Sequence, residues 1–95
     1  MAVREVRDNP ERSRYEITVD GKVAGVAEYD TAGTTLTFTH TEVDRSTRER
    51  GLGADLVRAA LDDVRASGRT VIAQCPFVTS FIKEHPEYAD LLVIG

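Results

Sequence analysis

The sequence predicts an α+β fold, with a mixed, mostly antiparallel sheet of about five strands, a central parallel pair and two to three helices. Three observations favour this class. Segments 15–19 and 35–41 alternate apolar and polar side chains at the two-residue period of a strand. Residues 54–66 then repeat apolar side chains at the period of a helix. The β-branched pair Val71-Ile72 that follows predicts one further strand, which returns to the sheet.

The size and composition of the chain limit its class. Ninety-five residues fit one domain, residues 1–95, with one modest core. Hydrophobic content of 41% and charged content of 29% are ordinary for a globular protein, which argues against disorder. No apolar run reaches the ~18 residues of a membrane span, and the N-terminus lacks the apolar core of a signal peptide. The single cysteine, Cys75, excludes an internal disulfide, so we expect a cytoplasmic protein.

Charge and composition also limit the partners. A net charge of −4 at pH 7 disfavours nucleic acid and anionic membranes, because contact with phosphates along a surface requires a basic face. Two histidines and one cysteine at unrelated spacings predict no metal site. We expect a monomer or a weak homodimer.

The first residues predict the start of an antiparallel meander. Residues 2–7 predict an edge strand, which ends at Asp8-Asn9-Pro10. The next strand has one apolar face, and its polar residues lie on the other face. That apolar face consists of Tyr15, Ile17 and Val19.

Two short turns continue the meander. Asp20-Gly21 suits a type I′ hairpin turn and leads into a returning strand over residues 22–29. A second turn at residues 31–34 precedes another strand. Neighbours joined by turns this short are antiparallel, since parallel strands need a long crossover. In this last strand Leu36, Phe38 and His40 share one face, and the threonines at 35, 37, 39 and 41 share the other.

The second half begins with such a crossover. Residues 54–66 predict an amphipathic helix that packs on the sheet, and Gly68 ends it. Residues 69–74 then predict a short buried strand, parallel to the strand that ends near Thr41. The unit is right-handed.

The last residues predict a second helix. Phe77, Val78, Phe81 and Ile82 recur at the spacing of an amphipathic helix. Because Pro86 disfavours helical geometry in the residue before it, we expect this helix to end near His85. Residues 87–92 predict one further helical turn, and a last strand over residues 91–94 is the alternative.

The loop at residues 48–53, before the long helix, predicts a phosphate site. Its two glycines permit a tight turn and a close approach of the backbone to a ligand. Unpaired N–H groups at a helix start attract anions, and the neighbouring arginines add positive charge. The alternative is structural: Ser46-x-x-Glu49 resembles a capping box that starts the helix earlier.

The spacing Arg48-x-x-Gly51-x-Gly53 resembles the pyrophosphate-binding signature of the GNAT acetyltransferase superfamily, Gln/Arg-x-x-Gly-x-Gly/Ala. The whole chain is similar to a small group of single-domain GNAT-like N-acetyltransferases. This similarity is clearest in His40-Thr41-Glu42-Val43, Cys75-Pro76-Phe77-Val78 and His85-Pro86-Glu87-Tyr88. The resemblance implies a GNAT-like (acyl-CoA N-acyltransferase) fold and binding of acetyl-CoA. The backbone implied to hold its pyrophosphate belongs to Arg48, Glu49, Arg50, Gly51, Leu52, Gly53 and Ala54.

The resemblance also implies where the rest of the coenzyme lies. Backbone groups of Glu42 and Val43 would pair with the pantetheine arm where the parallel strands separate. Cys75, Phe77 and Phe81 would line the coenzyme groove. Most of the superfamily has one or two more helices between its first two strands, and these help to shape the acceptor site. Residues 8–14 replace them here, so the acceptor amine, whether a small molecule or a protein, stays unidentified.

Three residues are candidate catalytic groups. His40 suits a general base because its unperturbed pKa of about 6.5 lies near neutrality, and Glu42 is a second candidate. Cys75 ends the strand parallel to that of His40, so we expect the two side chains to approach each other. Cys75 would protonate the leaving thiolate or briefly carry the acetyl group. The structural alternatives are a histidine at the core edge, a solvated carboxylate and a small buried hydrophobe.

These observations predict an acetyl-CoA-dependent N-acetyltransferase that transfers the acetyl group directly to an amine. A non-catalytic acyl-CoA sensor or adaptor is the alternative, and the short connection at residues 8–14 supports it. A third possibility is a thioesterase that uses Cys75.

Overall fold

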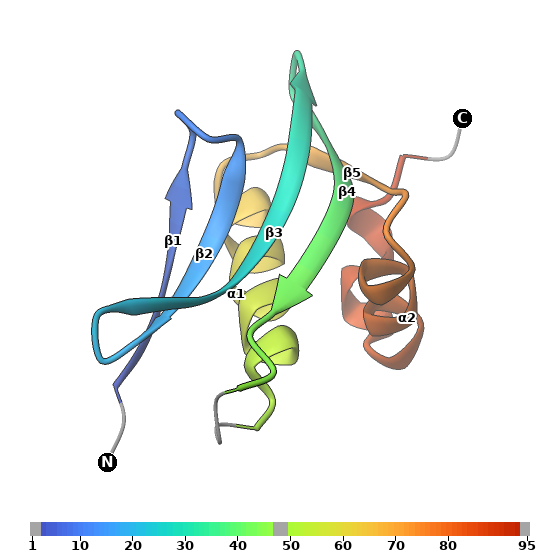
Figure 1. The fold of residues 1–95 in the computed structure, drawn as a ribbon. Helices are drawn as coiled ribbons and strands as arrows, with labels where there is room; N and C mark the ends of the chain where they lie inside the picture. The colour runs from blue at the N-terminus through green and yellow to red at the C-terminus, as the bar shows by residue number, and fades with distance from the viewer. Residues whose placement is uncertain (1–2, 47–49, 94–95) are drawn as a thin grey trace.

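The computed structural model describes residues 3–46 and 50–93 (Figure 1). Within these residues a five-stranded sheet carries two α-helices and a short 3-10 helix, which confirms the predicted α+β class. The elements in chain order are β1 (Arg4–Asn9), β2 (Arg14–Val19), β3 (Lys22–Ala32), β4 (Thr35–Val43), α1 (Leu52–Ala66), β5 (Thr70–Ala73), α2 (Pro76–Glu84) and η1 (Pro86–Leu91).

The strands lie side by side in the order in which they occur in the chain. β1 to β4 are antiparallel neighbours joined by short turns, and α1 crosses over to β5, which pairs parallel to β4. Both the meander and the parallel return strand are therefore confirmed. Because β5 is the outermost strand, the parallel pair lies at one edge of the sheet and not at its centre, which corrects the predicted position of the pair.

The hairpin turns follow their sequences closely. Asp20 and Gly21 have φ angles of 50° and 85°, and a type I′ turn requires positive φ at both of these positions. β3 continues to Ala32, further than predicted, and Gly33 makes the next turn with a φ of 61°. The longer strand gives β4 a partner along its whole length.

α1 packs across one face of the sheet and lies behind it in Figure 1. The helix begins directly after Gly51, and Gly68 follows its end with a φ of 72°, as predicted. Its apolar stripe and the inward side chains of the sheet form one hydrophobic core. The largest fully buried side chains are Tyr15, Ile17, Leu36, Phe38, Leu52, Leu56, Val57, Leu61, Val64, Val71 and Val78.

A β-bulge in β4 interrupts the alternation of its side chains. Tyr29 of β3 pairs with Phe38, whereas the residue before it, Glu28, pairs with His40. Thr39 is therefore an extra residue in β4. Every side chain after it points to the opposite face from the one that strict alternation predicts.

The bulge corrects the predicted faces of β4. His40 does not share the face of Leu36 and Phe38, because the inserted residue turns it to the side away from α1. Thr41 takes the core side instead, so the threonines of this strand do not all share one face. Alternation in a sequence cannot reveal an inserted residue, and for this reason the prediction for His40 and Thr41 is wrong.

β2 is buried on both faces, which its alternating sequence does not predict. Ile17 faces α1, and Glu16 on the other face is only 2% exposed. The Glu16 carboxylate accepts hydrogen bonds from the side chains of Arg7, Asn9 and Arg14. These three donors compensate for the loss of solvent around the carboxylate.

The C-terminal elements pack beside β5 (Figure 1). α2 ends before His85, and η1 is the further helical turn that the sequence predicts. The rings of Phe81 and Tyr88 join α2 to η1, with centroids 5.9 Å apart. Of the alternative last strand, the described residues contain one bridge from Leu92 to Val71, and Ile94 lies outside them.

Candidate functional site

β4 extends beyond its parallel neighbour and so has a free edge. β5 ends opposite Phe38, where the backbone N–H groups of Gln74 and Cys75 both donate to the Phe38 carbonyl. The chain then turns away into α2. Among the described residues, no strand pairs with residues 39–43 of β4 on this side, because the two strands separate here.

The register of β3 and β4 determines which backbone groups point to the free edge. The Asp44 N–H donates to the Ala24 carbonyl at 2.7 Å. Antiparallel partners alternate between bonded and non-bonded pairs, so the backbone of Glu42 also bonds to β3. The backbone groups of Thr41 and Val43 point outward instead. The backbone groups that reach the free edge are therefore those of Val43 and Thr41, and not those of Glu42.

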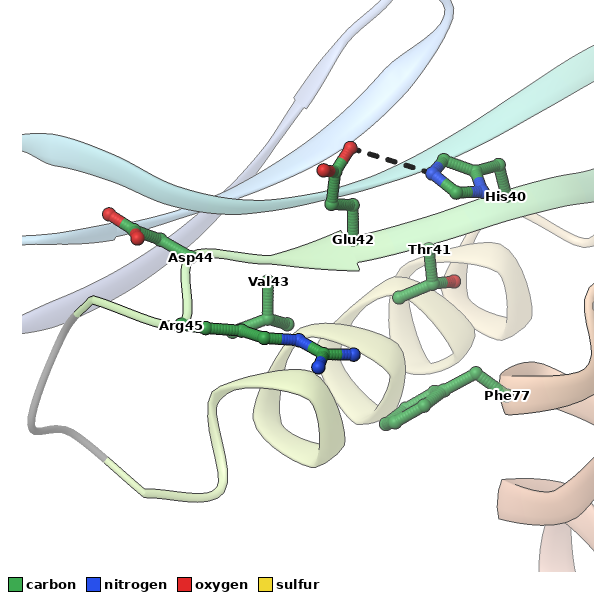
Figure 2. Close-up of a pocket in the computed structure, with 7 residues that line it drawn as sticks. All are labelled: His40, Thr41, Glu42, Val43, Asp44, Arg45 and Phe77. Atoms are coloured by element: carbon green, nitrogen blue, oxygen red, sulfur yellow. Dashed lines mark ion pairs between the residues drawn. The ribbon is translucent and has the colours of Figure 1, made fainter.

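An open cavity of about 560 Å³ surrounds this edge (Figure 2). β4 and the loop after it form most of the wall, and α2 contributes one aromatic side chain. The volume lies in the range of about 300–1,000 Å³ that is usual for ligand sites. The lining residues are His40, Thr41, Glu42, Val43, Asp44, Arg45 and Phe77.

The free edge divides this site into two sides. In Figure 2, His40 and Glu42 project from β4 away from α1, and Thr41 projects toward α1. The Cys75 thiol lies on the Thr41 side, with its Sγ 3.4 Å from the Thr41 Oγ1. β4 therefore separates His40 from Cys75, and the expectation that these two side chains approach each other is wrong.

Cys75 is a nearly buried thiol at the start of α2, with 4% exposure. Burial opposes its ionisation. The hydrogen bond with Thr41 and the backbone N–H groups of Val78 and Phe77 outweigh burial, so the pKa of Cys75 is lowered. These N–H groups act without closing a capping hydrogen bond to the sulfur. The result is an acidic thiol next to the point where the strands separate.

His40 and Glu42 form an exposed pair on the other side. The His40 Nε2 lies 3.5 Å from the Glu42 Oε2, and the two side chains are 56% and 73% exposed. A carboxylate at this distance helps to orient an imidazole ring. Within the described residues the second ring nitrogen of His40 has no partner, so it is open to a ligand at the cavity edge.

The start of α1 presents unpaired backbone donors next to this cavity. Gly51 precedes the helix with a φ of 74°, which favours glycine, and the first helical bond runs from the Asp55 N–H to the Gly51 carbonyl at 3.0 Å. In the part of the chain that the structure describes, the N–H groups of residues 52–54 have no hydrogen-bond partner. Together with the helix dipole, these donors favour an anion.

The alternative start of the helix is not observed. α1 begins at Leu52, and the Ser46 hydroxyl and N–H both donate to the Asp44 carboxylate instead. Glu49, the other half of the predicted capping box, lies outside the described residues, as does Arg48. Leu52 is 2% exposed, so only its backbone is available to a ligand.

The side chain of Arg4, from β1, contacts the start of α1. Its guanidinium pairs with the Asp55 carboxylate at 2.5 Å and donates to the Arg50 carbonyl at 2.6 Å. This pairing offsets the negative charge in the first turn, which would otherwise repel an anion. The contact joins positions 51 residues apart, and no local sequence pattern predicts it.

Gly53 lies in the first turn of α1, where the ring of Phe77 packs against it. A Cβ at this position would lie 2.6 Å from the Phe77 Cζ. The sequence predicts that this glycine lets the backbone come close to a ligand. In the structure, the ring of Phe77 occupies the space next to the Gly53 Cα instead. Phe77 is itself 42% exposed and so forms part of the cavity wall.

Phe81 lies one turn further along α2 and is nearly buried. The guanidinium of Arg58 lies 5.6 Å from its ring centroid, and the His85 ring lies 4.3 Å away. A second cavity, of about 180 Å³, opens beside these rings between α1 and α2. Its lining residues are Ala54, Phe77, Ser80, Phe81, Glu84 and His85.

Arg45 and Thr41 join the predicted site residues at the main cavity. Figure 2 shows the Arg45 side chain extending from the loop after β4 toward Phe77. The arginines of the loop could have identified Arg45 as a site residue from the sequence, whereas Thr41 lies beside Cys75 only because of the bulge.

Among the described residues there is no cluster of three or more side chains that would hold a metal ion. None of the described helices is long and apolar enough to cross a membrane.

A protein-family model described as GCN5-related N-acetyl-transferase matches residues 14–91. The chain belongs to the GCN5-related N-acetyltransferase family. The match begins at β2 and ends at η1, so it includes the free edge of β4, the start of α1 and Cys75. Family membership supports acetyltransferase activity as the general class of function. Comparison with curated proteins finds no match.

Two solved structures show that the family fold extends over most of the chain. A GCN5-like protein from Staphylococcus aureus, determined by NMR, is 20% identical with a TM-score of 0.70 and covers 94% of this chain and 87% of its own. The ribosomal-protein-S18-alanine N-acetyltransferase of Escherichia coli is 14% identical with a TM-score of 0.66, covering 90% and 76%. At these identities the similarity concerns the fold.

Proposed function

We propose that this protein is an acetyl-CoA-dependent N-acetyltransferase that acts on an amine. One observation carries the proposal: the ring of Phe77 lies in the cavity at the free edge of β4 and also contacts Gly53 at the start of α1, where the N–H groups of residues 52–54 have no partner among the described residues. An extended arm with amide groups and a diphosphate needs a strand edge and an anion site in this arrangement.

The residues at the site fit acetyl-CoA. The N–H groups of residues 52–54 suit the pyrophosphate, and Arg45 and Arg50 add positive charge nearby. The outward backbone groups of Thr41 and Val43 suit the amides of the pantetheine arm. The rings of Phe77 and Phe81 supply apolar walls for the groove between α1 and α2.

The two sides of β4 suit direct transfer. Acetyl-CoA supplies a thioester; as the amine nitrogen bonds to the carbonyl carbon, the carbon–sulfur bond breaks, giving an amide and a thiol. On the exposed side, His40 takes the proton that the amine loses, and Glu42 orients the ring or serves as the base itself. On the core side, the Cys75 thiol donates a proton to the departing sulfur. Cys75 is nearly buried, which favours this role over that of an acetyl carrier.

Thiol release from acetyl-CoA in the presence of a panel of amines tests the proposal. We expect turnover with at least one amine, and a loss of about 10²–10⁴-fold in His40→Ala if the imidazole is the base. Glu11→Gln, in an exposed turn far from the site, is the control for a change of surface charge. Tight binding without turnover would favour the sensor, and thiol release without any amine would favour the thioesterase.

Binding is measured separately by thermal unfolding. At a hundredfold excess over its dissociation constant, acetyl-CoA should stabilise the fold by about 2.7 kcal/mol, which raises the melting temperature by several degrees. Adenosine, which lacks the diphosphate and the arm, should give a much smaller shift. Equal shifts with both compounds would remove the support for the diphosphate site.

A further inference from the structure

One face of the sheet has no covering element in the described part of the chain. α1 packs on the opposite face, and α2 lies beside β4 and β5 at the edge (Figure 1). The register places alternate residues of β3 and β4 on this open face. They are Val26, Glu28 and Asp30 from β3, and Thr37, His40 and Glu42 from β4.

The β3–β4 half of the open face carries two acidic side chains, Glu28 and Asp30, that have no cationic partner in the described part of the chain. Glu28, Asp30 and Glu42 are exposed, and within the described residues the carboxylates of Glu28 and Asp30 make no ion pair or hydrogen bond. Arg14 lies across from Glu28, but its guanidinium pairs with the buried Glu16 at 2.8 Å. The cation opposite Glu28 in the register is therefore already engaged elsewhere.

The shape of this surface favours an extended chain over a small ligand. Small molecules bind in concave sites, and neither Glu28 nor Asp30 lines any of five cavities around the described residues. Glu28 and Asp30 lie two positions apart on one strand, so their Cα atoms are about 6.6 Å apart. Side chains at alternate positions of an extended peptide have the same spacing.

We propose that this face docks an extended basic peptide, which carries the acceptor amine to His40. The peptide places cationic side chains at alternate positions against Glu28 and Asp30. Glu28 lies opposite His40 in the register of β3 and β4, and His40 lines the main cavity, so the docking surface is continuous with that cavity. This inference rests on the proposed function, and it narrows the acceptor to a lysine-bearing or N-terminal amine in a basic segment.

The test compares two peptides that differ only in charge. One has an acetylatable lysine with arginines at alternate positions, and the other has glutamine in place of each arginine. With saturating acetyl-CoA, we expect kcat/KM to be higher for the basic peptide by about 4- to 25-fold, since each of the two exposed ion pairs contributes a factor of about two to five. This preference should disappear in the double variant Glu28→Gln/Asp30→Asn and weaken at high salt.

A matched control has the same change in net charge. Glu5→Gln/Glu11→Gln removes two exposed carboxylates, one at the far edge of the sheet and one in the β1–β2 turn. It should keep the full preference for the basic peptide. Both double variants should keep the thermal stabilisation by acetyl-CoA. Loss of the preference in the control as well would overturn the assignment to Glu28 and Asp30.

The outcomes separate this proposal from the one on which it rests. If the neutral peptide is acetylated as well as the basic one, or only a short linear polyamine is acetylated, the docking proposal fails and the N-acetyltransferase stands. If no amine is acetylated, the proposed function fails, and fluorescence anisotropy of the labelled basic peptide decides about docking. If Glu28→Gln/Asp30→Asn binds the peptide more weakly than the wild type does, the docking proposal is supported. Equal binding by the two proteins would overturn it.

Discussion

The contact between Gly53 and Phe77 allows a sharp test of the packing at the start of α1. A Cβ at Gly53 would lie 2.6 Å from the Phe77 Cζ and 3.1 Å from its Cε2. These atoms belong to the far end of a ring that is 42% exposed, so the ring has room to move outward. We expect Gly53→Ala to fold with Phe77 displaced from the cavity wall.

Two opposing effects determine the stability of this variant. Alanine is favoured over glycine in a helix by about 1 kcal/mol, whereas crowding at a packed position costs about 1–3 kcal/mol. In the wild-type background Gly53→Ala should therefore lower the free energy of unfolding by about 0–2 kcal/mol. In Phe77→Ala the crowding is gone, and the same substitution should raise it by about 0.5–1 kcal/mol. The sign of the effect reverses.

Urea unfolding of the wild type, both single variants and the double variant measures this coupling. We expect an interaction energy of about 1–3 kcal/mol, the range for residues in direct contact. Acetyl-CoA titration provides a second readout, in which Gly53→Ala and Phe77→Ala should each weaken binding by about tenfold, because each removes the ring from the wall. An effect of Gly53→Ala with the same sign and size in both backgrounds would refute the contact.

Three further predictions concern ionisable groups. Burial and the hydrogen bond to Asp8 raise the pKa of Tyr29 to about 12, so Tyr29 alone should reduce the stability of the fold by about 1.4 kcal/mol per pH unit as pH rises from about 10 to 12. Burial raises the pKa of Tyr15 and Tyr88 as well, so urea unfolding of Tyr29→Phe beside the wild type isolates this contribution, and the same pH dependence in both proteins would contradict it. Burial opposes ionisation of Glu16, but the hydrogen bonds and charges of its donors lower the pKa of this carboxyl. Glu16→Gln should therefore cost about 1–3 kcal/mol at pH 7 and flatten the loss of stability below about pH 4.5, as measured by urea unfolding. Thr41→Val should raise the pKa of Cys75 and move the pH profile of its alkylation by iodoacetamide upward, and an unmoved profile would remove Thr41 from the thiol environment.

Local patterns in the sequence predict most of the fold because the determinants are local. Asp20-Gly21 has the dipeptide preference of a type I′ turn, and the structure has positive φ at both residues. Pro86 ends α2 at the expected place, and Gly68 ends α1. Each of these signals acts within a few residues of the chain, so no tertiary information is required.

Contacts between distant segments account for what the sequence does not predict. Arg4 reaches Asp55 and Arg50 across the molecule, and no periodic pattern encodes such a pair. The burial of Glu16 depends on two donors from the neighbouring strand β1, Arg7 and Asn9, and only Arg14 lies on its own strand, two residues away. A polar residue in an alternating strand is read as exposed unless its partners are known.

The bulge at Thr39 has the largest effect on the site, because one inserted residue changes two properties of β4 together. With strict alternation, His40 and Glu42 would face the core beside Cys75, and their backbone groups would point to the free edge. The insertion reverses both assignments. It moves the side chains of His40 and Glu42 to the exposed side, where an acceptor can reach them, and it directs the backbone of Thr41 and Val43 toward the cavity. Under the proposed function, a bulge where the parallel strands separate would leave the open strand edge to the acyl arm and the other side of the strand, with His40, to the acceptor, so that the two need not compete for one side.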